Sequence, residues 1–278
     1  MYKTLISPAE LQQNYQAGNW VIVDCRFDLA DTQAGRRAYE SAHIPGAIYA
    51  HLDDDLSGEI IPGTTGRHPL PTVEEAIALF SLWGIDDSVQ VIAYDDKGGG
   101  VASRLWWMLR WLGHEAVAVL DGGWPAWQAA DLAISDKLAT VRPRQFKPQS
   151  TLASSIDAAG VDEVRERADY VVVDSRTPER YRGEVEPIDP VAGHIPGAIN
   201  LPFPANLADG KFLSPEELKA RFAAALGNTK GEQVVFYCGS GVTACHNILA
   251  YAHAGLGDAV LYPGSWSDWI TDTSRPVG

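Results

Sequence analysis

An internal repeat limits the fold of this chain more than any other feature of its sequence. Five landmarks recur in the same order in the two halves. They are a Val/Ile run ending in Asp-x-Arg (21–26, 171–176), a His-Ile-Pro-Gly-Ala turn (43–47, 194–198), a helix start (72, 214), an apolar strand (91–94, 234–237) and a Trp-x-x-Trp pair (124–127, 266–269). Chance rarely supplies five ordered matches, and two long copies indicate a duplicated domain rather than a solenoid.

Each copy alternates short apolar strands with helical segments. In the first copy the pattern predicts strands at 21–24, 89–94 and 117–120 and helices at 72–83, 101–112 and 124–130. Such alternation predicts an α/β fold, in which each copy has a parallel sheet with helices on both faces. We expect a first domain at 1–138 and a second at 151–278. Between them, 139–150 has the Pro- and Arg-containing composition of a linker.

The composition limits partners and location. With 46% apolar and 21% charged residues, the 278-residue chain is typical of a globular protein. Its 22 basic and 36 acidic residues give a net charge of −14, which argues against nucleic acid or an anionic membrane as the main partner. The three cysteines Cys25, Cys238 and Cys245 are too few and odd for a disulfide framework, so they fit a reducing compartment. Because the sequence shows neither a secretory signal nor a membrane span, we expect a cytoplasmic protein.

Cys238 stands between an apolar strand and a helical segment. A cysteine at such a helix start meets converging N–H groups and the positive end of the helix dipole, which favour thiolate over thiol. We expect Gly239 and Gly241 to let the loop curl with positive φ and to keep the space above the sulfur open. The alternative is a buried, unreactive cysteine at the end of a core strand, because free cysteine is among the most buried residue types.

The repeat favours the reactive interpretation. Where the second copy has Cys238, the first has Asp95. A carboxylate cannot perform the sulfur chemistry of a thiolate, so we expect only the second copy to be catalytic. An acidic counterpart would be unusual at a strand-core position. We therefore expect an exposed loop position in both copies, at the carboxyl ends of the strands, where α/β sheets bind their ligands.

Together these motifs resemble the rhodanese superfamily of sulfurtransferases, and the resemblance covers essentially the whole chain. The loop from Cys238 to Thr243 is similar to that of 3-mercaptopyruvate sulfurtransferases. Thiosulfate-using rhodaneses of this tandem type instead carry Arg and Lys after the cysteine. The resemblance implies a catalytically silent first domain, a catalytic second domain and a site between them.

The resemblance also implies roles for individual residues. Cys238 matches the nucleophile that carries a persulfide. Ser240 matches a loop serine that acts with an Asp and a His of the first domain, here Asp53 and His68. Arg180 matches the arginine that grips the substrate anion. The remaining loop residues, which would line the substrate site, are Gly239, Gly241, Val242 and Thr243.

One position departs from the resemblance. The mercaptopyruvate enzymes have a second arginine before an Asp, and here Ile188 stands at that place, before Asp189. Arg182 is close in sequence and is the candidate replacement.

The loop itself bears on the choice of donor. It contains no Lys or Arg, and like charges about 4 Å apart repel by several kcal/mol at an effective dielectric near 20, which disfavours the thiosulfate dianion beside a thiolate. A mercapto-keto acid is a monoanion, and its enolate leaving group needs a proton or hydrogen-bond donors. We therefore predict sulfur transfer from 3-mercaptopyruvate, through a Cys238 persulfide, to a thiol, cyanide or thioredoxin-like acceptor, without cofactor or metal. Thiosulfate:cyanide sulfurtransfer through the same persulfide is the alternative.

Two other functions compete. A cysteine-dependent phosphatase would need an arginine six residues after Cys238, where Ala244 stands. A non-catalytic binding module is disfavoured by the intact cysteine loop. The site residues have structural alternatives as well. They are a turn residue for Ser240, a solvent-exposed histidine for His68, a solvated acidic run for Asp53 and a surface ion network for Arg180. Residues kept in both copies are expected to be structural: His43, His194, Asp24, Arg26, Asp174, Arg176 and the Trp pairs.

Overall fold

A computed structural model describes residues 1–278, which form two compact units. Unit 1 comprises Met1–Gly58, Pro71–Leu152 and Asp209–Phe212, and unit 2 comprises Glu59–Leu70, Ala153–Ala208 and Leu213–Gly278. The domain limits at 138 and 151 stay a prediction. Two segments depart from chain order, because residues 59–70 of the first repeat belong to unit 2 and residues 209–212 of the second repeat belong to unit 1.

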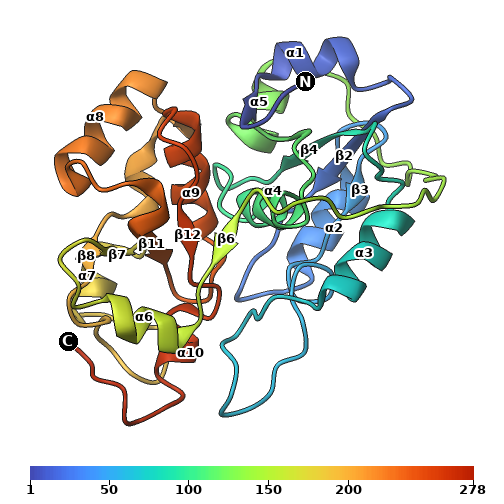
Figure 1. Cartoon of the computed structure of the whole chain (residues 1–278). Coiled ribbons are helices and arrows are strands. Elements are labelled where there is room, and N and C mark those ends of the chain that lie inside the picture. The colour runs from blue at the N-terminus through green and yellow to red at the C-terminus, as the bar shows by residue number, and fades with distance from the viewer. The chain divides into compact units, whose positions relative to one another are not determined.

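Unit 1 is built on a five-stranded sheet with the order β1-β5-β4-β2-β3, and all of its pairings are parallel. Its strands are β1 (Leu5–Ile6), β2 (Trp20–Asp24), β3 (Ile48–Tyr49), β4 (Gln90–Tyr94) and β5 (Val117–Leu120). Its helices are α1 (Pro8–Asn14), α2 (Ala34–Ser41), α3 (Val73–Leu82), α4 (Ala102–Trp111) and α5 (Gly123–Ala129). Residues of α1, α2 and α5 share one core cluster with the sheet, and α4 packs against β4 and β5 (Figure 1).

Unit 2 repeats this topology with the order β6-β12-β11-β7-β8, again all parallel. Its strands are β6 (Ser154–Ser155), β7 (Val171–Asp174), β8 (Ile199–Asn200), β11 (Val234–Tyr237) and β12 (Val260–Leu261). Its helices are α6 (Ala158–Val164), α7 (Pro178–Tyr181), α8 (Pro215–Leu226), α9 (Ala244–His253) and α10 (Ser265–Trp269). The remaining short elements are η1 (Phe203–Asn206), β9 (Leu207–Ala208), β10 (Lys211–Phe212) and η2 (Gly231–Gln233), of which β10 lies in unit 1. The shared strand order confirms the duplication and the α/β fold class.

Local sequence explains the main boundaries. Thr72 and Ser214 each accept the N–H of a Glu three residues later, and that Glu side chain accepts the N–H of the cap residue. These capping boxes begin α3 and α8 as predicted. The central strands are buried on both faces, which is why they appear in the sequence as uninterrupted apolar runs.

The Asp-x-Arg motif has the same structural task in both units. Arg26 donates to both carboxylate oxygens of Asp24, and Arg176 does the same to Asp174. All four residues are buried, and each guanidinium lies over a tryptophan ring of its own unit. Their predicted structural role is confirmed, since a bidentate pair satisfies charges that would be costly to bury alone.

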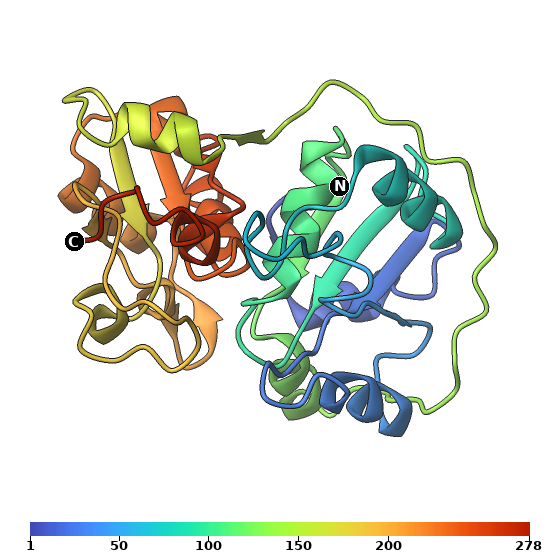
Figure 2. The ribbon, with the colours of Figure 1, turned by 90° about the horizontal axis from the view of Figure 1, so that it is seen from below.

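The segment with linker composition packs along unit 1. Figure 2 shows it as an extended stretch without helix that runs around the outside of unit 1. The Arg144 N–H donates to the Ser81 carbonyl at 2.9 Å, the Gln149 N–H donates to the Leu112 carbonyl at 2.9 Å, and Phe146 is buried. This stretch is therefore held in place by backbone bonds and one apolar anchor.

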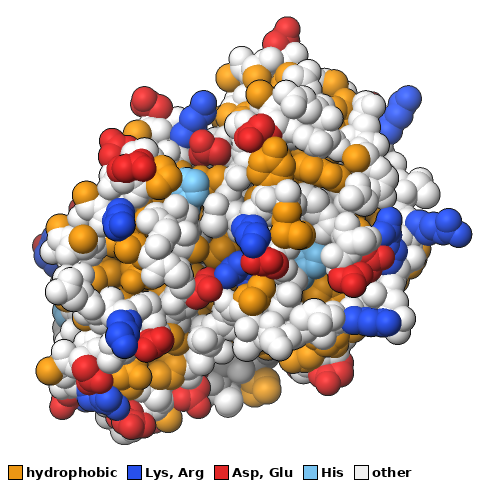
Figure 3. All heavy atoms as spheres, turned by 45° about the horizontal axis from the view of Figure 1, so that its top comes forward, with side chains coloured by type: hydrophobic (Ala, Val, Ile, Leu, Met, Phe, Trp, Pro, Cys, Tyr) orange, Lys and Arg blue, Asp and Glu red, His pale blue; other side chains and the backbone are white.

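No helix here combines the length and the apolar character that crossing a lipid bilayer requires. On the face drawn in Figure 3, Lys and Arg side chains lie scattered among Asp and Glu side chains. The basic residues on that face therefore form no continuous stripe.

The loop after β4 shows how unit 1 uses the position that corresponds to Cys238. Asp95 is 1% exposed. One of its carboxylate oxygens accepts the N–H groups of Lys97 and Gly99, both at 2.8 Å, and the other accepts those of Val101 at 2.7 Å and Ala102 at 2.9 Å. The prediction of an exposed position was wrong for both copies, since Cys238 is only 2% exposed. The loop curls around its first side chain because N–H groups at a helix start need an acceptor.

Replacing Asp95 should therefore destabilise unit 1. Asp95→Ala removes the acceptor of four N–H groups, and we expect the free energy of unfolding to fall by about 3 kcal/mol, because an unsatisfied buried donor costs about 1–3 kcal/mol. Asp95→Asn keeps one acceptor oxygen and should lose about half as much. Urea unfolding followed by circular dichroism measures both, with the exposed Asp96→Asn as the control. A loss below about 1 kcal/mol for Asp95→Ala would contradict this role of the carboxylate.

Candidate active site

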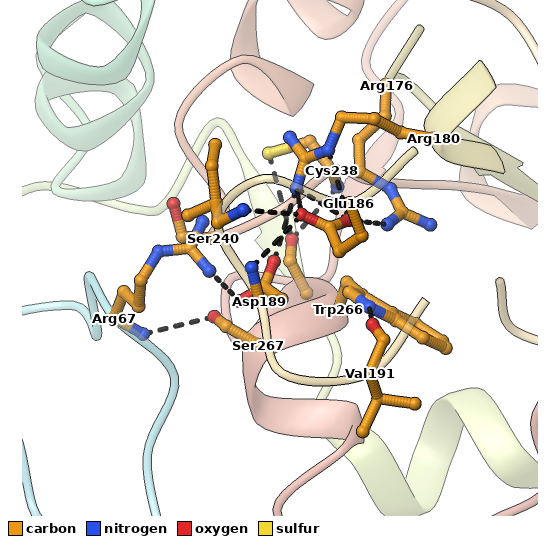
Figure 4. Close-up of polar contacts among 12 residues, drawn as sticks. Arg67, Arg176, Arg180, Glu186, Asp189, Val191, Cys238, Ser240, Trp266 and Ser267 are labelled. Carbon is orange, nitrogen blue, oxygen red and sulfur yellow. Dashed lines mark hydrogen bonds and ion pairs between the residues drawn. The ribbon is translucent and has the colours of Figure 1, made fainter. Parts of the chain in front are cut away.

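Cys238 directly follows β11 and is held by hydrogen bonds on two sides, one at its backbone N–H and one at its sulfur (Figure 4). Its own N–H donates to the Ser265 hydroxyl oxygen at 3.0 Å. The Gly241 N–H is directed at the Cys238 sulfur at 3.1 Å. The sulfur thus lies inside the curl of its loop, and an N–H dipole there stabilises negative charge on it.

The two loop glycines have different tasks. Gly241 has φ of 76°, and a Cβ there would clash with the Pro263 carbonyl, so this position requires glycine. Gly239 is absent from the positive-φ positions, which corrects the expectation for it. A Cβ at Gly239 would lie 3.0 Å from Arg67 Nη2 and 3.4 Å from Arg180 Nη2. Glycine at 239 therefore lets two guanidinium groups approach the residue next to Cys238.

The end of the cysteine loop, before α9, occupies the same place as the residues of unit 1 whose N–H groups bind the Asp95 carboxylate. Val101 and Ala102 donate to the Asp95 carboxylate at the start of α4. Thr243 precedes Ala244, the first residue of α9, at the corresponding place. No backbone hydrogen bond within the chain uses the N–H groups of Val242 and Thr243. The loop of unit 2 therefore has donors available to a negative charge on or near the Cys238 sulfur.

Ser240 and His68 form a buried pair. His68 Nδ1 lies 2.7 Å from Ser240 Oγ, and the two residues are 5% and 6% exposed. Both belong to unit 2, although they are 172 positions apart in sequence. His68 is thus not a solvent-exposed histidine, and Ser240 does more than occupy a turn. A hydroxyl hydrogen-bonded to an imidazole can pass a proton in either direction.

Arg180 lies on the short helix α7, and its guanidinium contacts a network of buried acids. It donates to Glu186 at 2.8–3.1 Å and to Asp189 at 3.2 Å. Glu186 also accepts from Arg176 at 3.2 Å. The surface network expected as the alternative is therefore a buried one, in which the Glu186 and Asp189 side chains are 3% and 2% exposed.

Burial and charge act in opposite directions on the two acids. For Glu186, burial raises the pKa, but the hydrogen bonds from Arg180 and from backbone N–H groups outweigh it, so the pKa is lowered. For Asp189, burial dominates and raises the pKa in spite of the nearby Arg67 and Arg180. Glu186 is thus the firm anchor of Arg180, and Asp189 is the more easily protonated partner.

Two predicted residues are not brought into this cluster. Arg182 is about half exposed, and its guanidinium pairs with Glu184 at 2.7 Å and with Glu179 at 4.0 Å. A surface pair with its own acids does not support it as the replacement for a second site arginine. Asp53 belongs to unit 1, where its N–H donates to His51 Nδ1 at 3.2 Å. Its action with His68 stays a prediction.

No three His, Cys, Asp or Glu side chains are grouped so that they could hold a metal ion. The cluster brings together a cysteine sulfur that faces a backbone N–H, a hydroxyl–imidazole pair and two guanidinium groups.

Comparison with known proteins agrees with this geometry. The model of the rhodanese-like domain matches residues 7–130 and 157–272. The chain belongs to the rhodanese family. It is 46% identical to a probable 3-mercaptopyruvate sulfurtransferase of Pseudomonas aeruginosa, over 98% of this chain and 97% of that protein. It is 42% identical to a putative thiosulfate sulfurtransferase of Mycobacterium tuberculosis, over 99% and 97%. Among solved structures, a 3-mercaptopyruvate sulfurtransferase from Leishmania major has a TM-score of 0.84 and 34% identity, covering 99% of this chain and 76% of that one.

Sequence reasoning missed several residues of this rhodanese site. Arg67 stands out in the sequence only by its place next to His68, and Asp189 only by its place after Ile188. Glu186 carried no signal of its own. Ser265 could have been found from the repeat, because its counterpart in unit 1 is Gly123.

Ser265 holds Cys238 in place, and its own backbone is strained. Its φ is 56°, a left-handed value that is uncommon for a residue with a side chain, and Gly123 has nearly the same φ of 55°. The Ser265 hydroxyl accepts the Cys238 N–H, donates to the Tyr262 carbonyl at 2.9 Å and lies 4.0 Å from the Cys238 sulfur. A strained serine where unit 1 has glycine points to a task specific to the cysteine loop.

Removing this hydroxyl should slow sulfur chemistry more than it destabilises the rhodanese fold. Ser265→Gly relieves the positive φ, so its unfolding free energy should match that of the wild type within about 1 kcal/mol. Ser265→Ala keeps the strain and should be less stable than Ser265→Gly. We expect both to react with iodoacetamide at Cys238 about tenfold more slowly than the wild type, since a Cys238 N–H without its acceptor no longer fixes the loop. Equal labelling rates in all three proteins would remove this role.

Proposed function

We propose that this protein is a sulfurtransferase that moves a sulfane sulfur from 3-mercaptopyruvate, through a persulfide on Cys238, to a thiol or cyanide acceptor. One observation carries the proposal. The Cys238 sulfur receives a backbone N–H at 3.1 Å, and two guanidinium groups lie against the next residue, Gly239. The relatives named 3-mercaptopyruvate sulfurtransferase support it.

In the first half-reaction the Cys238 thiolate attacks the sulfur of 3-mercaptopyruvate. A sulfur–sulfur bond forms with the thiolate electron pair, and the carbon–sulfur bond breaks with its electron pair left on carbon. The products are the Cys238 persulfide and the enolate of pyruvate. The Gly241 N–H, which already points at the sulfur, stabilises charge on the persulfide.

The enolate needs a proton to become pyruvate. Ser240 is two residues from the nucleophile, and its hydroxyl is hydrogen-bonded to His68 at 2.7 Å. We assign to this pair the delivery of that proton, with His68 restoring the Ser240 hydroxyl from solvent. Asp53 would orient His68, as the family resemblance implies.

In the second half-reaction a thiolate or cyanide attacks the outer sulfur of the persulfide. The sulfur–sulfur bond breaks, its electron pair returns to Cys238, and the acceptor leaves as a persulfide or as thiocyanate. A small thiol or the exposed thiol of a thioredoxin-like protein has the required chemistry. We place this reaction in the cytoplasm, where such thiols are kept reduced.

Thiosulfate is the second candidate donor, and one structural observation favours it. The sequence argument against thiosulfate assumed that no cation lies near the loop, yet Arg67 and Arg180 both lie within 3.5 Å of the Gly239 Cβ position. Two guanidinium groups can offset the repulsion between a dianion and a thiolate. A relative of similar identity is named a putative thiosulfate sulfurtransferase. We therefore rank 3-mercaptopyruvate first because of the His68–Ser240 pair rather than because of loop charge.

Intact-mass measurement tests the persulfide. After incubation with 3-mercaptopyruvate, and separately with thiosulfate, the wild type should gain one sulfur atom, and Cys238→Ser should gain none. Cys25→Ser is the matched control and should load like the wild type, because burial first and the Asp95 charge second raise the pKa of the Cys25 thiol and keep it unreactive. No adduct with either donor would refute the proposed function, and the ratio of kcat/KM for the two donors would identify the preferred one.

The His68–Ser240 pair should matter more for one donor than for the other. Sulfite leaves thiosulfate with its charge and needs no proton, whereas the pyruvate enolate does. We expect His68→Asn and Ser240→Ala to lower kcat with 3-mercaptopyruvate by about 100-fold, the usual contribution of general acid–base catalysis, and to lower kcat with thiosulfate by less than about tenfold. Equal losses with both donors would mean that the pair only shapes the loop.

A further inference from the structure

We propose that Arg67 is the second cation for the donor's carboxylate and that it supplies, from the segment 59–70, the charge that Ile188 does not. This inference rests on the proposed function and adds a specificity residue to it. Its partner in the task is Arg180.

The Arg67 and Arg180 guanidinium groups lie close to Gly239. A Cβ at Gly239 would lie 3.0 Å from Arg67 Nη2 and 3.4 and 3.5 Å from the two terminal nitrogens of Arg180. The two guanidinium groups therefore converge on the residue that follows the nucleophile. The close-up in Figure 4 shows Arg67 near Ser240 and Arg180 near Cys238, although the two arginines come from distant segments of the chain.

A shared carboxylate keeps the two positive guanidinium groups together. Asp189 lies between them, with one carboxylate oxygen on Arg67 Nη1 and the other 3.2 Å from Arg180 Nη2. The Asp189 side chain is 2% exposed, so this bridge is shielded from water. A buried carboxylate that accepts from two arginines fixes both planes, and it uses only one edge of Arg67.

Both arginines keep guanidinium N–H donors that the acids do not bind. The Nε–Nη2 edge of Arg67 faces away from the nitrogen that Asp189 binds. Arg67 Nε is buried and has no hydrogen-bond partner, and Nη2 is the atom nearest to Gly239. On Arg180, Glu186 and Asp189 occupy Nε and Nη2, while Nη1 points toward Gly239. The free Nε–Nη2 edge is one by which a guanidinium grips a carboxylate with two parallel bonds.

Hydrogen bonds through Ser267 hold the Arg67 backbone in place. The Arg67 N–H donates to the Ser267 hydroxyl at 3.0 Å, and the Ser267 N–H donates to the Gly239 carbonyl at 2.9 Å. Ser267 thus ties the backbone of Arg67 to the cysteine loop. A cation held at both its backbone and its guanidinium binds an anion with little loss of side-chain entropy.

Ile188 explains why this arrangement is needed. It is 40% exposed and lines a cavity of about 260 Å³ together with Ile60, Ile270 and Pro190, beside Arg67 and Asp189. The position that the family resemblance gives to an arginine is therefore part of an apolar wall. Arg67 reaches the loop from the other side of Asp189, which makes the carboxylate of an α-keto acid a fitting ligand for the Arg67–Arg180 pair.

Steady-state kinetics with 3-mercaptopyruvate test the assignment. We expect Arg67→Gln to raise KM about 10- to 100-fold, the effect of losing a charge-assisted hydrogen bond, while kcat changes less than threefold. Arg67→Lys keeps the charge and the contact with Asp189 but loses the fork, so its KM should lie between. The surface variant Arg167→Gln, whose arginine pairs with Asp169 at 2.8 Å, is the matched control and should behave like the wild type.

A rescue variant separates binding from folding. In Arg67→Gln/Ile188→Arg the new arginine stands next to Asp189, and KM should return to within about threefold of the wild type. Calorimetric titration with pyruvate, which carries the carboxylate but no sulfur, should show the same order of affinities. A KM within threefold of wild type in Arg67→Gln, or a loss in kcat alone that Ile188→Arg does not repair, would overturn the assignment. Failure of the wild type to take up sulfur would instead refute the proposed function.

Discussion

Backbone N–H groups at the start of α4 and of α9 need a negative partner, and the rest of each unit follows from how that need is met. In unit 1 the partner is the Asp95 carboxylate, which accepts four N–H groups. In unit 2 the Gly241 N–H is directed at the Cys238 sulfur, a smaller group that leaves other donors unused. The same loop is therefore closed by its own carboxylate in unit 1, whereas the loop of unit 2 keeps backbone donors for a bound anion.

Charge balance around Cys238 follows from this. Arg67, Arg176 and Arg180 meet Asp174, Glu186 and Asp189, so three cations face three acids in a largely buried cluster. Unpaired charges there would lose too much solvation free energy on burial. The acids offset this loss for the arginines and fix the planes of their guanidinium groups. Because each acid occupies only part of its arginine, donors remain on the side of Gly239. The cluster thus combines a neutral total charge with a locally positive surface beside the sulfur.

Much of the fold could be predicted from sequence, because the repeat and the strand–helix periodicity are local patterns that survive in the structure. The parallel sheets, the capped helices at Thr72 and Ser214 and the structural Asp-x-Arg pairs all follow from such patterns. The site was only partly predictable. Cys238, Ser240 and His68 carry motif signals, and the structure brings Ser240 and His68 together. The acids that orient Arg180 carry no such signal, because burial and partner choice depend on the packed chain.

The least predictable element is the segment 59–70, whose sequence is Gly- and Pro-rich and suggests an irregular loop of the first repeat. It belongs to unit 2 because its backbone can approach the turn before α10 very closely. A Cβ at Gly66 would lie 2.6 Å from the Ser267 hydroxyl and 2.7 Å from the Gly264 carbonyl, so only glycine fits there. That one close approach places Arg67 and His68, the next two residues, on either side of the cysteine loop: the first beside Gly239 and the second on Ser240. A glycine without a side chain therefore lets the Arg67 guanidinium and the His68 imidazole both reach the cysteine loop.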